Sequence, residues 1–489
     1  MSNLNNQIIT ATKWSAITEL LAKVASPITT MLLARLLAPE AFGVVATVTM
    51  LVTFAEVFTD AGFQKYIMQH EFSDDDDMDL SVSVAFTYNL LLSVIIWLII
   101  FSFRFSISHV IGAIGQEDAI AVASLSIPIA SFSSIQFALY RRKLDFKTLC
   151  YVRVICSFLP FLITIPLAYI YRSYWALIIG TLVGNLVQSI VLTLKSSWKP
   201  RISVNFQKLR SMFSFCGWTL LDSILSWCTW YMDVFFVGTL LNEYYLGVYK
   251  TSMSLVSNIM NLAYASFFPI LIPALAKLQN DIPALNNTLL KFQKVSCLII
   301  LPLGIIIFAY RELITNIILG PQWIDAASFV GLWAIIDVFV VLFTRFTGSA
   351  FVAIGKPKIS VIDNILHLVV LLPAIYIAAH YDFQTLYVTR SLVRLEGVLV
   401  AFILTYYTLK LAPWKMIINI LPEVISGLSI LVIAKIISTL DPNIYISILF
   451  IAISIIVYIL LLLCFKNDRE IIKKLYNYVS STIFKKKVN

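Results

Sequence analysis

The sequence predicts an all-α integral membrane protein of about fourteen transmembrane helices. Of its 489 residues, 60% are hydrophobic and only 13% are charged. The mean hydropathy is +0.88, and apolar runs of bilayer-spanning length recur from one end of the chain to the other. A water-soluble chain of this length needs far more charged surface, so the soluble classes of protein are excluded.

The apolar runs follow one another with short connections, and each is expected to form one membrane-spanning helix. The first run carries Glu19 and Lys23, which predicts a retained span rather than a cleaved signal peptide. No polar stretch reaches the length of a soluble domain. The predicted spans are 12–37, 41–64, 80–103, 118–140, 149–170, 174–194, 211–239, 245–276, 291–310, 324–354, 358–379, 385–409, 416–439 and 443–465.

Lysine and arginine gather in alternate connections, which predicts the orientation of the chain. With the N-terminus in the cytoplasm, the basic segments 195–210 and 466–489 both lie inside. The acidic stretch 74–79 departs from this bias, but acidic residues contribute little to the rule. We therefore expect a multi-pass protein of the bacterial inner membrane with both termini cytoplasmic. Contact with anionic membrane lipids accounts for the net charge of +9, so nucleic acid is not an expected partner.

The residues that usually carry catalysis or bind metals form no recognisable pattern. Six cysteines lie in or beside apolar runs without a Cys-x-x-Cys pair, and four histidines are scattered along the chain. No loop is long enough to hold an active site outside the membrane. The chain is therefore expected not to be an enzyme and to hold no metal and no cofactor.

A short internal repeat predicts two related halves. Leu-Leu occurs at 36–37 and at 240–241, and each pair is followed after four residues by a large apolar residue and Gly-Val. Both copies lie at outer hairpins six spans apart. The sequence therefore predicts two six-helix lobes, related as a parallel pseudo-two-fold repeat around a central cavity, with two extra C-terminal helices.

The repeat sets the expected organisation of the chain. The predicted parts are an N-terminal lobe 1–194, a basic cytoplasmic linker 195–210, a C-terminal lobe 211–410, two additional helices 411–465 and a basic cytoplasmic tail 466–489. The residues expected to shape the repeat hairpins are Arg35, Pro39, Gly43 and Gly247.

Polar side chains recur every three or four residues on the first, second, seventh and eighth spans, so each span has one polar face. A polar face cannot point at lipid tails, and the four faces are expected to converge on a water-filled cavity. Ser and Thr side chains can also hold helices together, and this structural alternative stays open. The acidic and amide members are Glu19, Glu56, Asp60, Asp222, Asp233, Asn258 and Asn261.

Cations within the spans are candidates for binding an anionic substrate. A guanidinium deep in a membrane needs an anion, and it binds a phosphate through two hydrogen bonds. Two structural alternatives remain: Glu19 can neutralise Lys23, and Asp337 can pair with Arg345. The acidic residues leave room for coupling to H⁺ or Na⁺. The candidate cavity cations are Lys23, Lys250, Arg345 and Arg394.

Several segments together resemble a known family. Leu33–Gly43 and Phe58–Phe63, with Asp233–Gly238 and Leu319–Trp323, are similar to Wzx-type polysaccharide transporters. These belong to the multidrug/oligosaccharidyl-lipid/polysaccharide flippase superfamily, and the colanic acid and teichuronic acid exporters form the nearest branch. The resemblance covers about residues 8–410.

This resemblance implies a flippase that moves oligosaccharide units on undecaprenyl pyrophosphate across the inner membrane by alternating access. Such units supply O-antigen, capsule or exopolysaccharide. The implied partners are the lipid-linked oligosaccharide, membrane lipids, a polysaccharide polymerase and a chain-length regulator. The resemblance also implies that the first, second, seventh and eighth helices line the cavity.

Two other functions are alternatives. A cation-coupled multidrug exporter of the same superfamily would share the two lobes, but that family usually has twelve spans, and the last two spans argue against it. A membrane polysaccharide polymerase needs a large outer loop with catalytic side chains, and no predicted outer loop is long enough.

Overall fold

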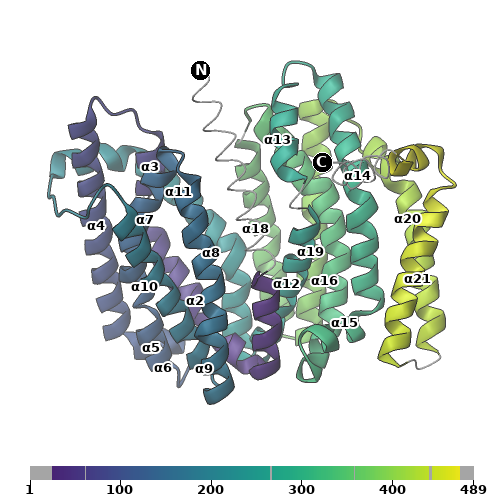
Figure 1. Cartoon of the computed structure of the whole chain (residues 1–489), viewed down its shortest axis with the longest axis horizontal. Coiled ribbons are helices and arrows are strands. Elements are labelled where there is room, and N and C mark those ends of the chain that lie inside the picture. Colours follow the sequence, from purple (N-terminus) through teal and green to yellow (C-terminus); the bar gives the residue numbers. More distant parts are fainter. Residues whose placement is uncertain (1–24, 61, 265–266, 357, 440–442, 474–489) are drawn as a thin grey trace, which may run out of the picture. The chain divides into compact units, whose positions relative to one another are not determined.

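The computed structural model describes residues 25–60, 62–264, 267–356, 358–439 and 443–473. All regular structure in these ranges is helical (Figure 1), as the sequence predicts. Eleven of the described helices are long and apolar enough to cross a membrane. The chain is therefore a multi-pass, all-α membrane protein.

The chain forms two compact units. The first consists of residues up to Thr251 together with Leu371–Leu386, and the second of Ser252–Val370 together with the residues from Tyr387 onward. These units are clusters of contacts and not sequence repeats, so the predicted boundaries of the lobes, the linker and the additional helices stay predictions.

The first unit contains a described helical segment at residues 25–36 and most of the helices that precede α12. Its helices are α2 (Pro39–Asp60), α3 (Phe63–Gln69), α4 (Asp75–Ser102), α5 (Arg104–Val110), α6 (Glu117–Ala123), α7 (Ser126–Arg142), α8 (Phe146–Leu162), α9 (Thr164–Tyr171), α10 (Trp175–Lys195) and α11 (Phe206–Leu240), with the start of α12 (Glu243–Tyr264).

The second unit contains the rest of α12 and most of the helices that follow it. These are α13 (Phe268–Ala276), α14 (Ile282–Ala309), α15 (Arg311–Ile318), η1 (Pro321–Ala326), α16 (Ala327–Phe339), η2 (Val340–Arg345), α17 (Phe346–Ala353), α18 (Lys358–Ala379), α19 (Phe383–Leu409), α20 (Pro413–Ser438) and α21 (Ile444–Leu462). The end of α18 and the start of α19 belong to the first unit.

Helices occupy the positions of the predicted spans, although the count of fourteen stays a prediction. Most of the first predicted span, 12–37, lies outside the described residues. The seventh and eighth correspond to α11 and α12, which are 35 and 22 residues long. Both helices carry polar stripes, which lower their mean hydropathy. For this reason α11 and α12 are not among the eleven helices that are apolar enough to be identified as spans by composition.

The acidic stretch 74–79 has a structural role in the first unit. The Asp74 carboxylate caps α4 by accepting a hydrogen bond of 2.7 Å from the Asp77 backbone N–H. Asp77 pairs with Lys208, and Asp79 lies 3.4 Å from Arg201. The acidic loop thus neutralises part of the basic segment 195–210, which explains why it departs from the charge bias of the other loops.

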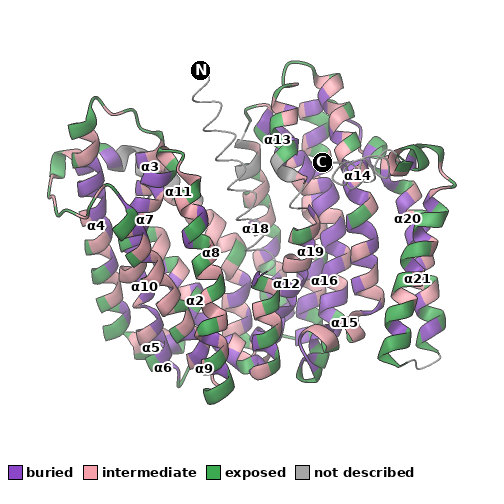
Figure 2. Ribbon diagram, viewed as in Figure 1, coloured by how far each residue is buried: buried purple, intermediate pink, exposed green. Residues whose placement is uncertain are grey.

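Burial within the second unit distinguishes inner from outer helices. Figure 2 shows buried residues along α14 and α16, whereas α21 is largely exposed. α20 packs against both α14 and α21. Most of the exposed side chains of α20 and α21 are large and apolar, for example Val432, Ile436 and Leu449, as expected for surfaces that face lipid.

Candidate substrate and ion sites

The second unit brings three arginines, one carboxylate and two aromatic rings together around η2. This element is a π-helical turn between α16 and α17, and such turns shift the register of the residues that follow them. We call the group the arginine cluster. Its members are Tyr264, Trp333, Asp337, Arg345, Arg390 and Arg394.

Each arginine of the cluster has an aromatic neighbour. The Arg394 guanidinium carbon lies 4.0 Å from the centre of the Trp333 ring, and that of Arg390 lies 5.4 Å from the same ring. The Arg345 guanidinium lies 5.0 Å from the Tyr264 ring centre and donates a hydrogen bond to the Tyr264 hydroxyl. Flat, delocalised guanidinium groups stack well on such rings.

The ion pair of the cluster differs from the structural alternative that the sequence suggests. Asp337 accepts a hydrogen bond from Arg394 on α19, across the unit. The proposed pairing of Asp337 with Arg345 is therefore wrong. The two residues lie eight positions apart, and the π-helical turn between them directs Arg345 towards Tyr264 on α12 instead.

The cluster has surplus positive charge and unused donors. In the described part of the chain, Arg345 and Arg394 bring two positive charges to the one carboxylate of Asp337. Among the described residues, nitrogen Nη1 of Arg394 and Nε1 of Trp333 are buried without a hydrogen-bond partner. Buried N–H donors without partners are costly, and an anion can accept from both kinds of donor. The cluster is therefore suited to an anionic group such as a phosphate.

Lys250, another predicted cation, lies in the first unit. Its ammonium nitrogen is 4.9 Å from the centre of the Tyr231 ring. Asp233 lies nearby on α11, is only 1% exposed, and accepts a hydrogen bond of 2.8 Å from the Tyr249 hydroxyl. This bond ties α11 to α12, so Asp233 holds the second hairpin together.

A cavity of about 250 Å³ lies inside the first unit, between α2, α7 and α10, and half of its lining residues are polar; we call it the polar cavity. The stripe of α2 faces it with Thr49, Thr53 and Glu56. The opposite walls add hydroxyl and amide groups from Ser126, Thr181 and Asn185. Glu56 thus faces water-sized space and oxygen-bearing side chains, an environment that can hold a proton or a small cation.

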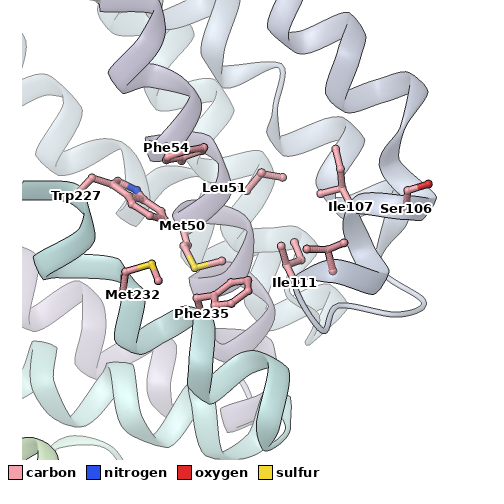
Figure 3. A pocket seen from close by; sticks show the side chains of 10 residues that line it. Met50, Leu51, Phe54, Ser106, Ile107, Ile111, Trp227, Met232 and Phe235 are labelled. Atoms are coloured by element: carbon pink, nitrogen blue, oxygen red, sulfur yellow. The ribbon is translucent and has the colours of Figure 1, made fainter. Parts of the chain in front are cut away.

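The other face of α2 borders an apolar pocket of about 410 Å³ (Figure 3). Met50 and Phe54 of α2 meet Trp227 and Phe235 of α11 there, and the Phe54 and Trp227 ring centres are 4.6 Å apart. The Trp227 indole N–H donates to the Thr53 hydroxyl at 3.2 Å. α2 therefore has a polar cavity on one face and an apolar pocket on the other. The expected convergence of the four polar stripes on one central cavity stays a prediction.

The two repeat hairpins cross each other at their glycines. A Cβ on Gly43 would lie 2.0 Å from the backbone oxygen of Glu243, and one on Gly247 would lie 1.8 Å from that of Pro39. Pro39 and Glu243 occupy equivalent positions in the repeat, as do the two glycines. The contact is thus reciprocal, as a local two-fold relation requires, and only glycine permits so close an approach.

The remaining predicted site residues are placed as follows. Glu19 and Lys23 lie outside the described residues, and so does the side chain of Asp222. Asp60 accepts a hydrogen bond of 3.4 Å from the Gln64 backbone N–H. Asn258 and Asn261 are half-buried on α12, and Arg35 is exposed near the first hairpin. Of the predicted cations, the second unit brings Arg345 and Arg394 together.

Sequence reasoning missed the aromatic partners and a buried ion cluster. Tyr264 and Trp333 carry no charge and resemble ordinary apolar span residues. Lys294 and Glu423, by contrast, are charges inside apolar runs, and a search for such charges would have found them. They form an ion pair of 3.0 Å in the second unit.

Comparisons with known proteins agree with this architecture. Residues 32–328 match a family described as polysaccharide biosynthesis protein. An uncharacterized membrane protein in the cps region of Klebsiella pneumoniae is 24% identical and matches over 78% of each chain. The succinoglycan biosynthesis transport protein ExoT of Rhizobium meliloti (strain 1021) is 24% identical over 63% of this chain and 62% of its own. The lipopolysaccharide biosynthesis protein WzxC of Escherichia coli (strain K12) is 20% identical over 77% and 76%.

Solved structures share the fold at low sequence identity. The lipid II flippase MurJ in an inward closed conformation aligns with a TM-score of 0.74 at 15% identity, covering 94% of this chain and 99% of its own. An inward-facing multidrug resistance MATE family transporter of the MOP superfamily aligns with a TM-score of 0.62 at 16% identity, covering 81% and 98%.

The family match covers more than half of the chain and includes both repeat hairpins. It confirms the resemblance to Wzx-type transporters that the hairpin motifs carry. The chain is a member of the polysaccharide biosynthesis protein family.

Proposed function

We propose that this protein is a flippase that moves undecaprenyl-pyrophosphate-linked oligosaccharide units from the inner to the outer leaflet of the bacterial inner membrane. The arginine cluster is the observation that carries this proposal. It holds positive charge and unused donors within apolar helices, where an uncompensated charge is costly. A diphosphate headgroup supplies the missing negative charge and acceptors.

The geometry suits diphosphate recognition better than recognition of a neutral molecule. The Arg345 guanidinium lies against the Tyr264 ring of α12, and the Arg394 guanidinium lies against the Trp333 ring of α16. Two rigid forks held by aromatic rings can each bind one phosphate group. Lys250 stays a proposed substrate-binding cation in its own right.

The sugar part needs polar side chains that replace water while it crosses the hydrocarbon layer. Desolvating a polar group without a partner costs several kcal/mol, roughly 2–7 in model systems. The stripes of α2, α11 and α12 offer such partners, and the lipid tail stays in the bilayer. Alternating access requires only different affinities in two states, so no bond is made or broken and the protein is not an enzyme.

Energy coupling is proposed at the polar cavity of the first unit. Glu56 is suited to binding H⁺ or Na⁺ in one state and releasing it in the other, because a carboxylate at membrane depth needs a neutralising cation. Transport in reconstituted vesicles should therefore rise with a proton or sodium gradient, and Glu56→Gln should remove that dependence. Asp118→Asn, a change at a side chain that is 86% exposed, is the matched control. Equal gradient dependence in wild type and Glu56→Gln would contradict the coupling role.

Deleting the gene tests the function directly. The oligosaccharide should still be assembled on its carrier lipid but remain on the cytoplasmic side, and surface polysaccharide should be lost. The measurement is extraction of carrier-linked oligosaccharide after treatment of intact spheroplasts with an impermeant sugar-modifying reagent. Carrier-linked units that reach the outer leaflet but stay unpolymerised would instead indicate a polymerase. A polymerase and a chain-length regulator are proposed as partners that act on the flipped unit.

A cation-coupled multidrug exporter is the second candidate, because the fold is shared with a MATE transporter. The surplus positive charge of the arginine cluster disfavours cationic drugs as substrates. If deletion leaves surface polysaccharide unchanged and raises sensitivity to cationic drugs, the exporter function is correct.

A further inference from the structure

A second buried ionic cluster lies in the second unit, on helices that the arginine cluster does not use. Lys294 of α14 is 3.0 Å from a carboxylate oxygen of Glu423 on α20 and 2.8 Å from one of Asp468, which follows α21. The two carboxylate side chains are 0% exposed, and that of Lys294 is 8% exposed. We call these three residues the C-terminal ion triad.

Counting the residues that the structure describes, the triad is one positive charge short. Two ionised carboxylates around one ammonium group leave a net negative charge out of contact with water, and like charges held this close repel each other strongly. Deprotonating Lys294 would make the imbalance worse, because both carboxylates would then lose their partner. The stable way to neutralise the triad is to add one cation.

Carboxylate oxygens without hydrogen-bond partners show where the additional cation can bind. Oxygen Oε1 of Glu423 is buried and has no hydrogen-bond partner among the described residues, and the same holds for Oδ2 of Asp468. The Ser426 hydroxyl, one turn further along the same face of α20, is also buried and has no hydrogen-bond partner in the described part of the chain. A protonated carboxylic acid has an O–H donor that a carboxylate lacks. If Glu423 or Asp468 were protonated, this O–H would have the oxygens of the other carboxylate as nearby acceptors.

The other titratable groups around the triad do not supply the missing charge. Cys297 on α14 and Tyr458 on α21 interact electrostatically with Glu423. Both are neutral when protonated and anionic when deprotonated, so neither balances the second carboxylate. The Tyr458 hydroxyl donates to the Leu298 backbone oxygen at 3.5 Å.

We propose that the C-terminal ion triad binds one proton, shared between Glu423 and Asp468, and that this proton holds α20 and the segment after α21 against α14. The site is separate from the arginine cluster and from Glu56, and it does not depend on the flippase function. A bound Na⁺ is less suitable, because the Lys294 ammonium already occupies the space between the carboxylates.

Thermal unfolding of the full-length protein in nanodiscs tests the proposal without any transport assay. If the folded state holds a proton that the unfolded chain releases, the Tm of the wild type should fall as the pH rises. Between about pH 6 and about pH 9 the expected decrease is on the order of a few degrees. Glu423→Gln mimics the protonated acid, so its Tm should exceed that of the wild type at high pH and should change much less with pH.

Glu470→Gln is the matched control, because Glu470 is exposed and lies two residues after Asp468. This variant should keep the pH dependence of the wild type. Asp468→Asn should behave like Glu423→Gln and replaces it if the latter does not fold. A pH-independent Tm in the wild type, or equal pH dependence in wild type and both variants, would overturn the proposal. A Tm that rises when choline is replaced by Na⁺, in the wild type but not in Glu423→Gln, would identify the cation as Na⁺ instead.

Discussion

At the scale of single residues, Arg345 is the cation at which a substitution best distinguishes a substrate-binding role from a structural role. It is half-buried, contacts the Tyr264 ring and hydroxyl, and has no described carboxylate within ion-pair distance. Arg394 also holds Asp337, so replacing Arg394 leaves a buried carboxylate without this partner, which destabilises the fold. A change at Arg345 avoids this complication.

Arg345→Gln should lower export of carrier-linked oligosaccharide by about ten- to a hundredfold, because a hydrogen bond to a charged group contributes roughly 1.5–3 kcal/mol. Arg345→Lys keeps the charge without the planar fork, so its export rate should lie between that of the wild type and that of Arg345→Gln. Protein levels measured by immunoblot should be unchanged. The control is Lys435→Gln, which removes an exposed cation near the end of α20. Normal export in Arg345→Gln would mean that this arginine only braces α12.

The site residues that could be predicted from the sequence are the charged ones, because charged side chains are rare in membrane spans. Arg345, Arg394 and Glu56 stood out because charges are rare in spans. Trp333 and Tyr264 did not, because aromatic rings are common there. The partner of Asp337 could not be predicted, since a π-helical turn changes the register of α16 and α17 without any sequence signal that spacing alone can detect.

At the scale of helices, the crossing of α2 and α12 depends on the absence of two side chains. Gly247→Ala should place a methyl group against the Pro39 carbonyl, and such overpacking typically costs about 1–3 kcal/mol. The expected results are a lower Tm and reduced export. Gly184→Ala is the control, because a Cβ at this position of α10 would meet no atom of the described residues within 4 Å, and alanine favours a helix more than glycine does. Equal Tm values in the two variants would show that α2 and α12 can move apart to accept the methyl group without a measurable loss of stability.

The helices themselves were largely predictable, because their apolar runs are long and their ends are marked by polar residues. Asp74, Asn205 and Asp281 each accept a hydrogen bond from the third residue along, at the start of α4, α11 and α14. The acidic loop was harder to interpret, because its partners Lys208 and Arg201 lie far along the chain.

At the scale of the whole molecule, the orientation in the membrane is the prediction that the loop charges make. Reporter fusions at Asn489 and within 195–210 should be active in the cytoplasm, because basic loops stay inside. A fusion next to Glu243 should report the external side. Activity of the Asn489 fusion outside the cell would reverse the orientation, and the proposed direction of transport with it.

The reciprocal crossing of the hairpins also bears on the ancestry of the chain. Each glycine packs against the main chain of the other hairpin, and every amino acid has the same main-chain carbonyl. The crossing therefore places no demand on the side chains opposite the glycines, which differ as much as Pro39 and Glu243 do. A duplicated gene that kept such a joint would retain its two glycines long after the rest of the copies had diverged.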